Sequence, residues 1–253
     1  GATPHAITDC LCYGNPEKPE QMWQFVEGVR GINDACKIIT LKHSKESPTP
    51  IIAGNVSFYN ESKDKPIPPS PIISCLGRIQ DVEKAITMSF KRENSSIILI
   101  GKRKNELGGS IFYDLHNELG KNVPTPDLNE VKNQIYGITD CIEKGLVFAC
   151  HDISEGGVAA SLCEMTFGNS IGCSVNIESK LSTEKTLFSE TGGFILETKK
   201  ENVDPIHYIF NQYKLDVYVI GITGGNKIKL NNAINITVDD AKKSWENGLR
   251  DKL

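Results

Sequence analysis

The sequence has no excess of basic residues, and this limits the partners that the protein can have. Its 28 lysines and arginines are outnumbered by 32 aspartates and glutamates, which gives a formal net charge of -4. The basic residues are also scattered along the chain. A surface that binds nucleic acid normally carries a concentrated positive patch. We therefore expect no nucleic-acid partner, and we expect any bound phosphate to be held locally.

Long apolar runs are absent as well. No stretch of roughly 18 apolar residues occurs, and Gly1 to His5 lack the basic and then apolar pattern of a signal peptide. These features predict a cytoplasmic protein without a membrane segment. The length of 253 residues predicts one large or two modest domains with a sizeable core.

The cysteines lack the spacing of a disulfide framework or a zinc site. Most of them lie in apolar stretches at irregular intervals, which favours buried free thiols. Cys10 and Cys12 are too close for the usual two-residue gap of a zinc knuckle, and no second pair matches them, which argues against a metal-thiolate site. The eight are Cys10, Cys12, Cys36, Cys75, Cys141, Cys150, Cys163 and Cys173.

Apolar periodicity predicts a small N-terminal part followed by a larger part in which strands and helices alternate. For the first part it predicts strands at 6–8, 50–53 and 71–77 and a helix at 21–36. For the second it predicts strands at 96–101, 147–150, 194–197 and 216–221 and helices at 128–146 and 158–167.

Two polar segments, Thr8 to Glu20 and Gly54 to Glu61, follow apolar runs and are rich in small, turn-forming and oxygen-bearing residues. Such segments occur where backbone approaches a charged ligand closely. We interpret them as loops that meet in space and together hold a triphosphate and its cation, and the alternative for each is an ordinary surface loop.

Four residues of these segments are candidates for ligand contacts. Asp9 ends a strand and can accept a nucleotide hydroxyl or a metal-bound water, or it can cap the local turn. Gly54 permits close approach of the backbone, and the Asn55 amide oxygen suits a hard cation. If the segment is extended, Asn55 and Ser57 share a face, so that one can contact metal and the other substrate.

Polar residues in the second part suggest an auxiliary pocket at one end of its sheet. Ser154 is a candidate N-cap, and the N–H groups of Gly156 and Gly157 would be accessible to an anion. His151 is a candidate base, although a hydrogen-bonded structural histidine is the more common case. The pocket candidates are Glu106, Gly108, Gly109, Ser110, His151, Asp152, Ser154, Gly156, Gly157, Ser189 and Glu190.

The chain resembles phosphoribosylformylglycinamidine synthase (FGAM synthase, synthetase subunit PurL) along essentially its whole length, and it matches only the C-terminal third of that family. The stretches that carry the resemblance are Thr8 to Glu20, Met22 to Phe25, Gly54 to Glu61, Pro66 to Pro71, Glu106 to Ser110, His151 to Gly157, Glu164–Met165 and Leu187 to Glu190.

The resemblance implies an α/β (α+β) fold. Residues 1–84 would be the C-terminal portion of the second PurM N-terminal-like, barrel-forming domain. Residues 85–253 would be the second PurM C-terminal-like α/β domain. An unpaired edge of the barrel would favour a homodimer.

The activity implied is that of a ligase of de novo purine biosynthesis that uses ATP and Mg²⁺. It phosphorylates the amide oxygen of formylglycinamide ribonucleotide (FGAR) and displaces the phosphate with ammonia from glutamine. By the resemblance, Asp9 and Gly54 contact ATP, Asn55 binds Mg²⁺ and Ser57 contacts substrate. The catalytic base would lie in the N-terminal half of the synthetase, so no catalytic residue is assigned here and the chain alone should be inactive.

The implied partners are that N-terminal half, the glutaminase subunit PurQ and the small PurS subunit. Departures from the family occur at Cys12–Tyr13, in the long stretch from Lys42 to Pro50, and at Thr191 to Phe194, where the family usually has Ser-Pro-Gly-Arg. The last departure weakens any transfer of anion binding to this domain. The alternatives are a non-catalytic nucleotide-binding or docking scaffold, and another member of the aminoimidazole ribonucleotide synthetase or selenophosphate synthetase superfamily.

Overall fold

The computed structural model describes residues 1–42, 44, 47–63 and 65–248. They form an N-terminal unit, Ala2–Glu83, and a C-terminal unit that comprises the rest of the chain. Among the described residues no helix is both long and apolar enough to cross a bilayer. The long stretch from Lys42 to Pro50 lies partly outside the described residues.

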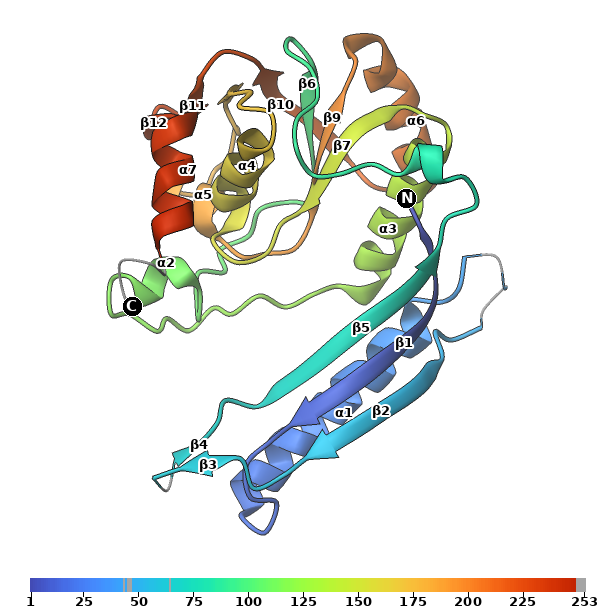
Figure 1. The fold of residues 1–253 in the computed structure, drawn as a ribbon, viewed down its shortest axis with the longest axis vertical. Helices are drawn as coiled ribbons and strands as arrows, with labels where there is room; N and C mark the ends of the chain where they lie inside the picture. Colours follow the sequence, from blue (N-terminus) through green and yellow to red (C-terminus); the bar gives the residue numbers. More distant parts are fainter. Residues whose placement is uncertain (43, 45–46, 64, 249–253) are drawn as a thin grey trace. The chain divides into compact units, whose positions relative to one another are not determined.

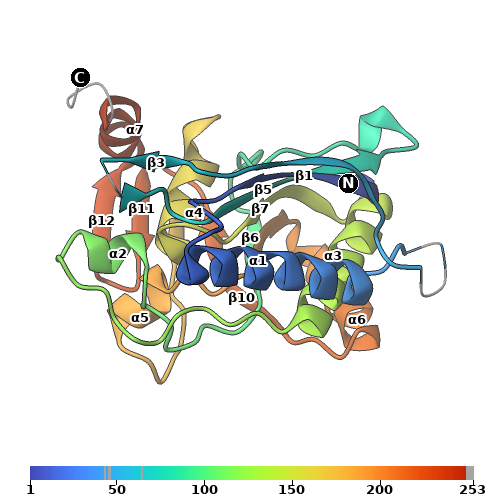
Figure 2. The same ribbon diagram turned by 90° about the horizontal axis from the view of Figure 1, so that it is seen from below.

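The N-terminal unit is a three-stranded sheet with one long helix on one face (Figures 1 and 2). The order of the strands is β2-β1-β5, in which β1 pairs with β2 in parallel and with β5 antiparallel. The elements are β1 (Thr3–Cys12), α1 (Pro19–Ile38), β2 (Ile51–Ser57) and β5 (Ser70–Arg78), with the two-residue strands β3 (Glu61–Ser62) and β4 (Lys65–Pro66) between β2 and β5.

Local sequence and aromatic packing position α1. Pro19 occupies the first turn, where its missing N–H is not needed, and Glu20 complements the positive end of the helix dipole. Phe25 of α1 then meets two rings edge to face, that of Tyr13 at 5.3 Å and that of Phe58 at 5.0 Å between centroids. These contacts fix α1 against the residues that follow β1 and β2.

The strands β1 and β2 are longer than the sequence predicts. β1 continues through Cys12 and β2 through Ser57, in segments that were expected to be loops. The reason is pairing on both sides of β1, where Leu11 lies opposite Val56 and also opposite Pro71. A sheet ladder satisfies backbone groups of polar and small residues that local propensity assigns to loops.

The C-terminal unit is built on a seven-stranded sheet in the order β12-β11-β8-β10-β6-β9-β7. All neighbours are antiparallel except β8 and β11. The strands are β6 (Ser96–Ile100), β7 (Val147–Asp152), β8 (Cys173–Val175), β9 (Phe194–Thr198), β10 (Val217–Thr223), β11 (Lys227–Leu230) and β12 (Ile234–Thr237).

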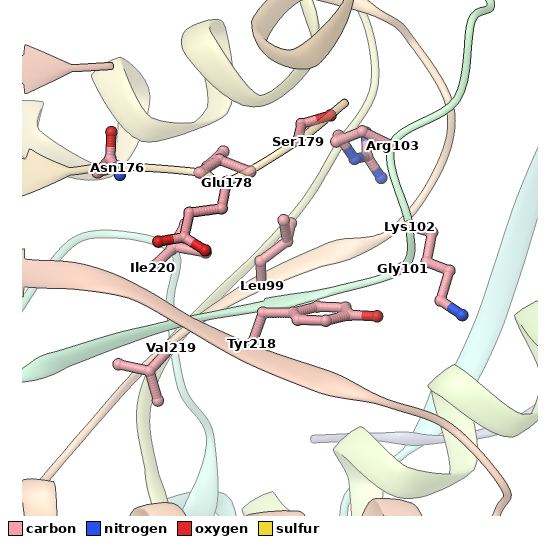
Figure 3. Close-up of a pocket in the computed structure, with 11 residues that line it drawn as sticks. Leu99, Gly101, Lys102, Arg103, Asn176, Glu178, Ser179, Tyr218, Val219 and Ile220 are labelled. Carbon is pink, nitrogen blue, oxygen red and sulfur yellow. The ribbon is translucent and has the colours of Figure 1, made fainter. Parts of the chain in front are cut away.

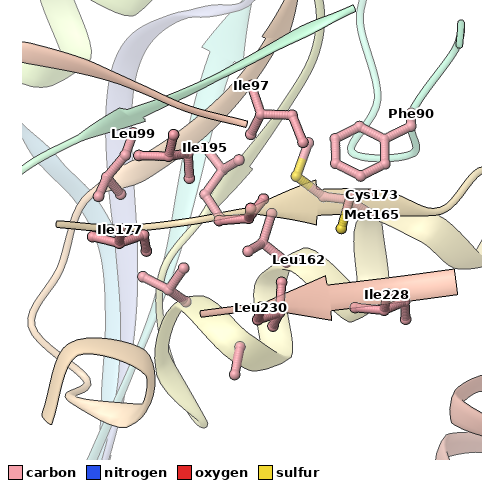
Figure 4. Close-up of a cluster of buried hydrophobic side chains, with 14 of the residues drawn as sticks. Phe90, Ile97, Leu99, Leu162, Met165, Cys173, Ile177, Ile195, Ile228 and Leu230 are labelled. Atoms are coloured by element: carbon pink, nitrogen blue, oxygen red, sulfur yellow. The ribbon is translucent and has the colours of Figure 1, made fainter. Parts of the chain in front are cut away.

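Helices cover both faces of this sheet, so β6 is buried on both sides. Ile97 and Leu99 belong to one apolar cluster (Figure 4). Ile98 and Ile100 belong to another, as expected for an apolar strand that is covered on both faces. The helices are α2 (Ile111–Asp114), α3 (Leu128–Glu143), α4 (Gly157–Phe167), α5 (Thr183–Phe188), α6 (Val203–Gln212) and α7 (Val238–Asn247), with short 3-10 turns at Val82–Lys84 and Lys200–Asn202.

The α/β class predicted from the sequence is confirmed. One local prediction is wrong, because Ser154 does not cap α4. Gly156 occupies the N-cap position with φ +74°, and the Ser154 carbonyl accepts a hydrogen bond from the Gly157 N–H at 3.0 Å. That left-handed conformation favours glycine.

Candidate functional site

The two polar segments of the N-terminal unit lie side by side. Asp9 pairs with Gly54 and Cys10 with Asn55 in the parallel register of β1 and β2. Beyond the strands, Glu61 joins the segments by an ion pair with Lys18 at 2.9 Å and by accepting the Asn15 N–H at 3.3 Å. The hydrogen bond from Lys18 is the main cause that lowers the pKa of the Glu61 carboxyl.

Asp9 lies on the face that α1 covers. A Cβ built on Gly54 would come within 2.3 Å of Asp9 Oδ1, so the carboxylate occupies the space above that glycine. On the same side, the Cβ of a residue at 28 in α1 would meet Tyr13 Oη at 2.0 Å. Asp9 lies on β1 and Tyr13 directly follows it, four residues further on, so both side chains point to the side of α1.

Asn55 and Ser57 lie on the opposite face, which α1 does not cover. The Asn55 amide is 3.4 Å from Cys10 Sγ, and Cys10 alternates with Asp9 along β1. Ser57 Oγ contacts the Asn60 side chain at 3.2 Å, and Asn60 also donates to the Tyr13 carbonyl at 2.9 Å. The strand is extended as required, so Asn55 and Ser57 share one face.

This geometry corrects one expectation. The two segments meet in space, but Asp9 and Asn55 point to opposite faces of the sheet, because a shift of one residue along a strand reverses the direction of the side chain. The side chains of Asp9 and Asn55 therefore do not bind one triphosphate and its cation together. The assignments of Asp9 and Gly54 to ATP, of Asn55 to Mg²⁺ and of Ser57 to substrate stay predictions.

Glu190 closes the anion site that was predicted at the start of α4. Its Oε1 accepts the backbone N–H of Gly156 at 2.9 Å and that of Ile111 at 2.9 Å. The Gly157 N–H is bonded to the Ser154 carbonyl. The expectation of free N–H groups at Gly156 and Gly157 is therefore wrong, since the chain supplies its own carboxylate.

His151 is hydrogen-bonded at both ring nitrogens. Its Nε2 lies 2.9 Å from Glu164 Oε2 on α4 and its Nδ1 lies 3.2 Å from Asp152 Oδ1, while only 14% of the side chain is exposed. Two carboxylates on one imidazole fix the orientation of the ring. This arrangement matches the hydrogen-bonded structural histidine that the sequence left open as the alternative to a base.

Most of the remaining auxiliary candidates make internal contacts. Ser189 Oγ donates to the Lys104 carbonyl, and Ser110 Oγ donates to that of Leu107. Glu106 accepts from Thr191 Oγ1 at 2.7 Å. A Cβ on Gly108 would clash with backbone of Asn122, whereas Gly109 has φ +70° and open space around it. These residues build the loops at one end of the sheet.

Arg103 was not selected from the sequence, yet it organises the same loops. Its guanidinium donates to the carbonyls of Thr191 and Gly192, each at 2.6 Å, and its Nε is buried without a partner. Burial lowers the pKa of Arg103 to about 10. It stands at the wall of a cavity of about 380 Å³ (Figure 3).

The cavity is formed by neighbouring strands that are distant in sequence. It lies at the ends of β6, β8 and β10. Tyr218 lines it, and Arg103 and Ser179 lie close to each other on one side (Figure 3). None of the auxiliary candidates lines it, whereas Glu106 and Glu190 line a second cavity of about 200 Å³ beside Pro124 to Glu130. The sheet order alone brings Tyr218 to Arg103, so periodicity along the chain gives no signal for this group.

Comparison with known families defines the class. The family described as "AIR synthase related protein, C-terminal domain" matches residues 92–231, and the corresponding N-terminal domain matches residues 1–79. The chain belongs to the AIR synthase related family.

Within this class the relatives are PurL proteins. The chain is 38% identical to phosphoribosylformylglycinamidine synthase subunit PurL of Methanothrix thermoacetophila over 100% of its length, and it covers 34% of that protein. The resemblance to PurL predicted from the sequence is confirmed, and the chain spans about a third of the curated relatives that it matches.

Solved structures show the same fold. PurL of Thermotoga maritima in complex with FGAR matches with a TM-score of 0.73 and 17% identity, over 95% of this chain and 40% of that one. The same protein in complex with ATP matches with a TM-score of 0.69 and 17% identity, over 95% of this chain and 38% of that one.

Proposed function

We propose that the chain is part of an FGAM synthase, the ATP-dependent ligase that amidates FGAR in purine biosynthesis with ammonia from glutamine. The likeness to PurL relatives over the whole of this chain supports this, as does the fold shared with PurL in complex with ATP and with FGAR. The observation that carries the proposal is the pairing of two segments that carry the resemblance, Asp9 against Gly54 and Cys10 against Asn55.

The side of the sheet without a helix is the proposed site for Mg²⁺ and substrate. Asn55 and Ser57 project there with oxygen atoms that suit a hard cation and a polar substrate. Two residues supply too few oxygens for the six ligands that Mg²⁺ prefers, so the site fits Mg²⁺ only as a partial one. The N-terminal half of the synthetase would complete it, and Asp9 with Gly54 would contact ATP on the other face.

Apolar residues exposed on the sheet support the need for a partner. Large side chains of β2 and β5 have between 44% and 60% of their surface exposed, and such patches mark interaction sites. They are Ile51, Ile52, Val56, Ile72, Ile73 and Leu76. We infer that residues 1–84 form part of a barrel-type domain completed by the N-terminal half, with PurQ and PurS as further subunits. A second copy of the chain is the alternative partner for these apolar residues. The molar mass of the isolated chain in solution shows whether it forms such a dimer.

The test is to combine the chain with the upstream half and measure FGAR-dependent ATP hydrolysis with glutamine or ammonia. Asn55→Ala is expected to lower kcat/KM about 100-fold, with rescue at high Mg²⁺. Asp9→Ala should raise the KM for ATP in particular, because it removes a contact on the other face. Asn33→Ala, at an exposed position of α1, is the control.

The scaffold alternative makes a different prediction. If Asn55→Ala and Asp9→Ala leave ATP hydrolysis unchanged while the complex still forms, the chain serves for docking and the catalytic proposal is wrong. Loss of activity in the Asn33→Ala control would instead indicate damage to the fold of the N-terminal unit.

A further inference from the structure

Two thiols stand together on the open face of the N-terminal sheet. Cys10 and Cys12 lie two residues apart on β1, so both side chains point to the face that carries Asn55. Their sulfur atoms are 3.9 Å apart. The spacing is unsuitable for a zinc knuckle in a loop, but the extended strand turns it into a pair of parallel thiols.

The distance between the sulfurs fits two ligands of a tetrahedral cation. With metal-sulfur bonds of about 2.3 Å and tetrahedral angles, two thiolates on Zn²⁺ lie roughly 3.8 Å apart. The observed 3.9 Å therefore needs almost no movement of the strand. A disulfide would instead require the sulfurs to approach to about 2.05 Å, which needs an oxidant and a distorted strand.

A third possible metal ligand lies beside the two cysteines, and no carboxylate lies directly opposite them on the neighbouring strands. The Asn55 amide is 3.4 Å from Cys10 Sγ, and a flip of the amide presents its oxygen in place of its nitrogen. The direct neighbours of Cys10 and Cys12 across the strands are Ile72, Ser70, Asn55 and Ser57. Soft sulfur ligands without carboxylates favour Zn²⁺ or Cd²⁺ over Mg²⁺.

We propose that Cys10 and Cys12 form a two-thiolate site for a thiophilic divalent cation, with Asn55 as the third ligand and water as the fourth. Binding converts two S–H groups to thiolates, so that two protons leave as one cation binds, and no electron is transferred. Within the described residues no group of three or more His, Cys, Asp and Glu side chains could hold a metal, so the third ligand of this site is an amide.

The site has a consequence that rests on the proposed function. Because Asn55 is the proposed Mg²⁺ ligand, a cation held by Cys10 and Cys12 would occupy the same face and inhibit the assembled enzyme. Because both thiols must lose their protons to ligate the cation, its affinity should increase with pH.

The binding test uses Cd²⁺ and the isolated, reduced 253-residue chain. The thiolate-to-cadmium absorption in the ultraviolet reports sulfur ligation, and native mass spectrometry counts the bound ions. We expect one tight Cd²⁺, and we expect Cys10→Ser and Cys12→Ser each to weaken it at least about tenfold. Cys75→Ser is the matched control, since Cys75 is an exposed thiol on β5 of the same sheet.

Two results would overturn the site. One is a wild-type absorption that persists in both single variants, and the other is an equal loss in the Cys75→Ser control. Circular dichroism of each variant shows whether the sheet has folded. The assay needs no ATP, FGAR or partner, so it can succeed when the enzymatic proposal fails. If Cd²⁺ binds at Cys10 and Cys12 but leaves the activity of the assembled enzyme unchanged, only the inhibitory consequence is lost.

Discussion

The Glu190 carboxylate binds backbone N–H groups at helix N-termini, as a bound anion does in many α/β proteins. It accepts the N–H groups of Gly156 at the start of α4 and of Ile111 at the start of α2. Negative charge at a helix N-terminus is favourable, and both N–H groups would otherwise be orphaned. A carboxylate from the chain itself therefore explains why acid and glycine residues cluster here.

Removal of this carboxylate should destabilise the C-terminal unit. We expect Glu190→Ala to lower the free energy of unfolding by about 1–3 kcal/mol, because two N–H groups lose their acceptor. Urea unfolding measures the change, and Glu155→Ala, an exposed acid in the same turn, should cost far less. Sulfate should stabilise the Glu190→Ala variant more than the wild type. Equal stability of the two variants would contradict this role of Glu190.

At the scale of elements, α3 and α6 pack closely through a glycine. A Cβ on Gly137 of α3 would come within 2.6 Å of the Phe210 ring of α6, and Phe210 is fully buried. In α1, by contrast, a Cβ on Gly31 would meet no atom within 4 Å. Glycine thus serves close packing at position 137 and only reduces helix propensity at position 31.

Alanine at these two glycines should have opposite effects. Gly137→Ala should destabilise the C-terminal unit by about 1–3 kcal/mol through overpacking. Gly31→Ala should stabilise α1 by up to about 1 kcal/mol, since alanine is the better helix former. Thermal or urea unfolding compares the two, and stabilisation by both substitutions would show that α3 and α6 are not in close contact.

Several strongly periodic elements were predicted, whereas the ten-residue helices α6 and α7 and the shortest strands were not. Apolar residues are numerous and regular enough to predict the helices α1, α3 and α4 and the strands β6, β7, β9 and β10. β8, β11 and β12 have only three or four residues, which is too short for an alternating pattern to be recognised with certainty. Their strand state is decided by neighbours in the sheet, which the local sequence does not contain.

At the scale of the whole molecule, three buried or partly buried thiols make folding sensitive to alkaline pH. Burial is the first cause that raises the pKa of Cys150 to about 12, of Cys163 to about 11 and of Cys173 to about 12. In the unfolded chain these thiols ionise near pH 9, whereas in the folded chain they stay neutral. A raised pKa stabilises the folded state below the unfolded value, and this contribution is lost as the pH rises toward the folded value.

The free energy of unfolding should therefore fall between about pH 9 and pH 11. Each of the three thiols contributes a slope of up to about 1.4 kcal/mol per pH unit in that range. Urea unfolding from pH 7 to pH 11 measures the slope, and Cys173→Ala should reduce it by about one thiol's share. A slope unchanged in that variant would contradict the assignment to buried thiols.

The sequence by itself determined the α/β class, the strongly periodic helices and strands, and the PurL resemblance. Apolar periodicity and sequence motifs are local properties of the chain. Only the tertiary structure decided where the polar side chains point. Strand pairing placed Asp9 and Asn55 on opposite faces, and it placed Cys10, Cys12 and Asn55 together on one. The physical reason is that side chains alternate along a strand, so their direction depends on strand extent and register, which long-range pairing sets.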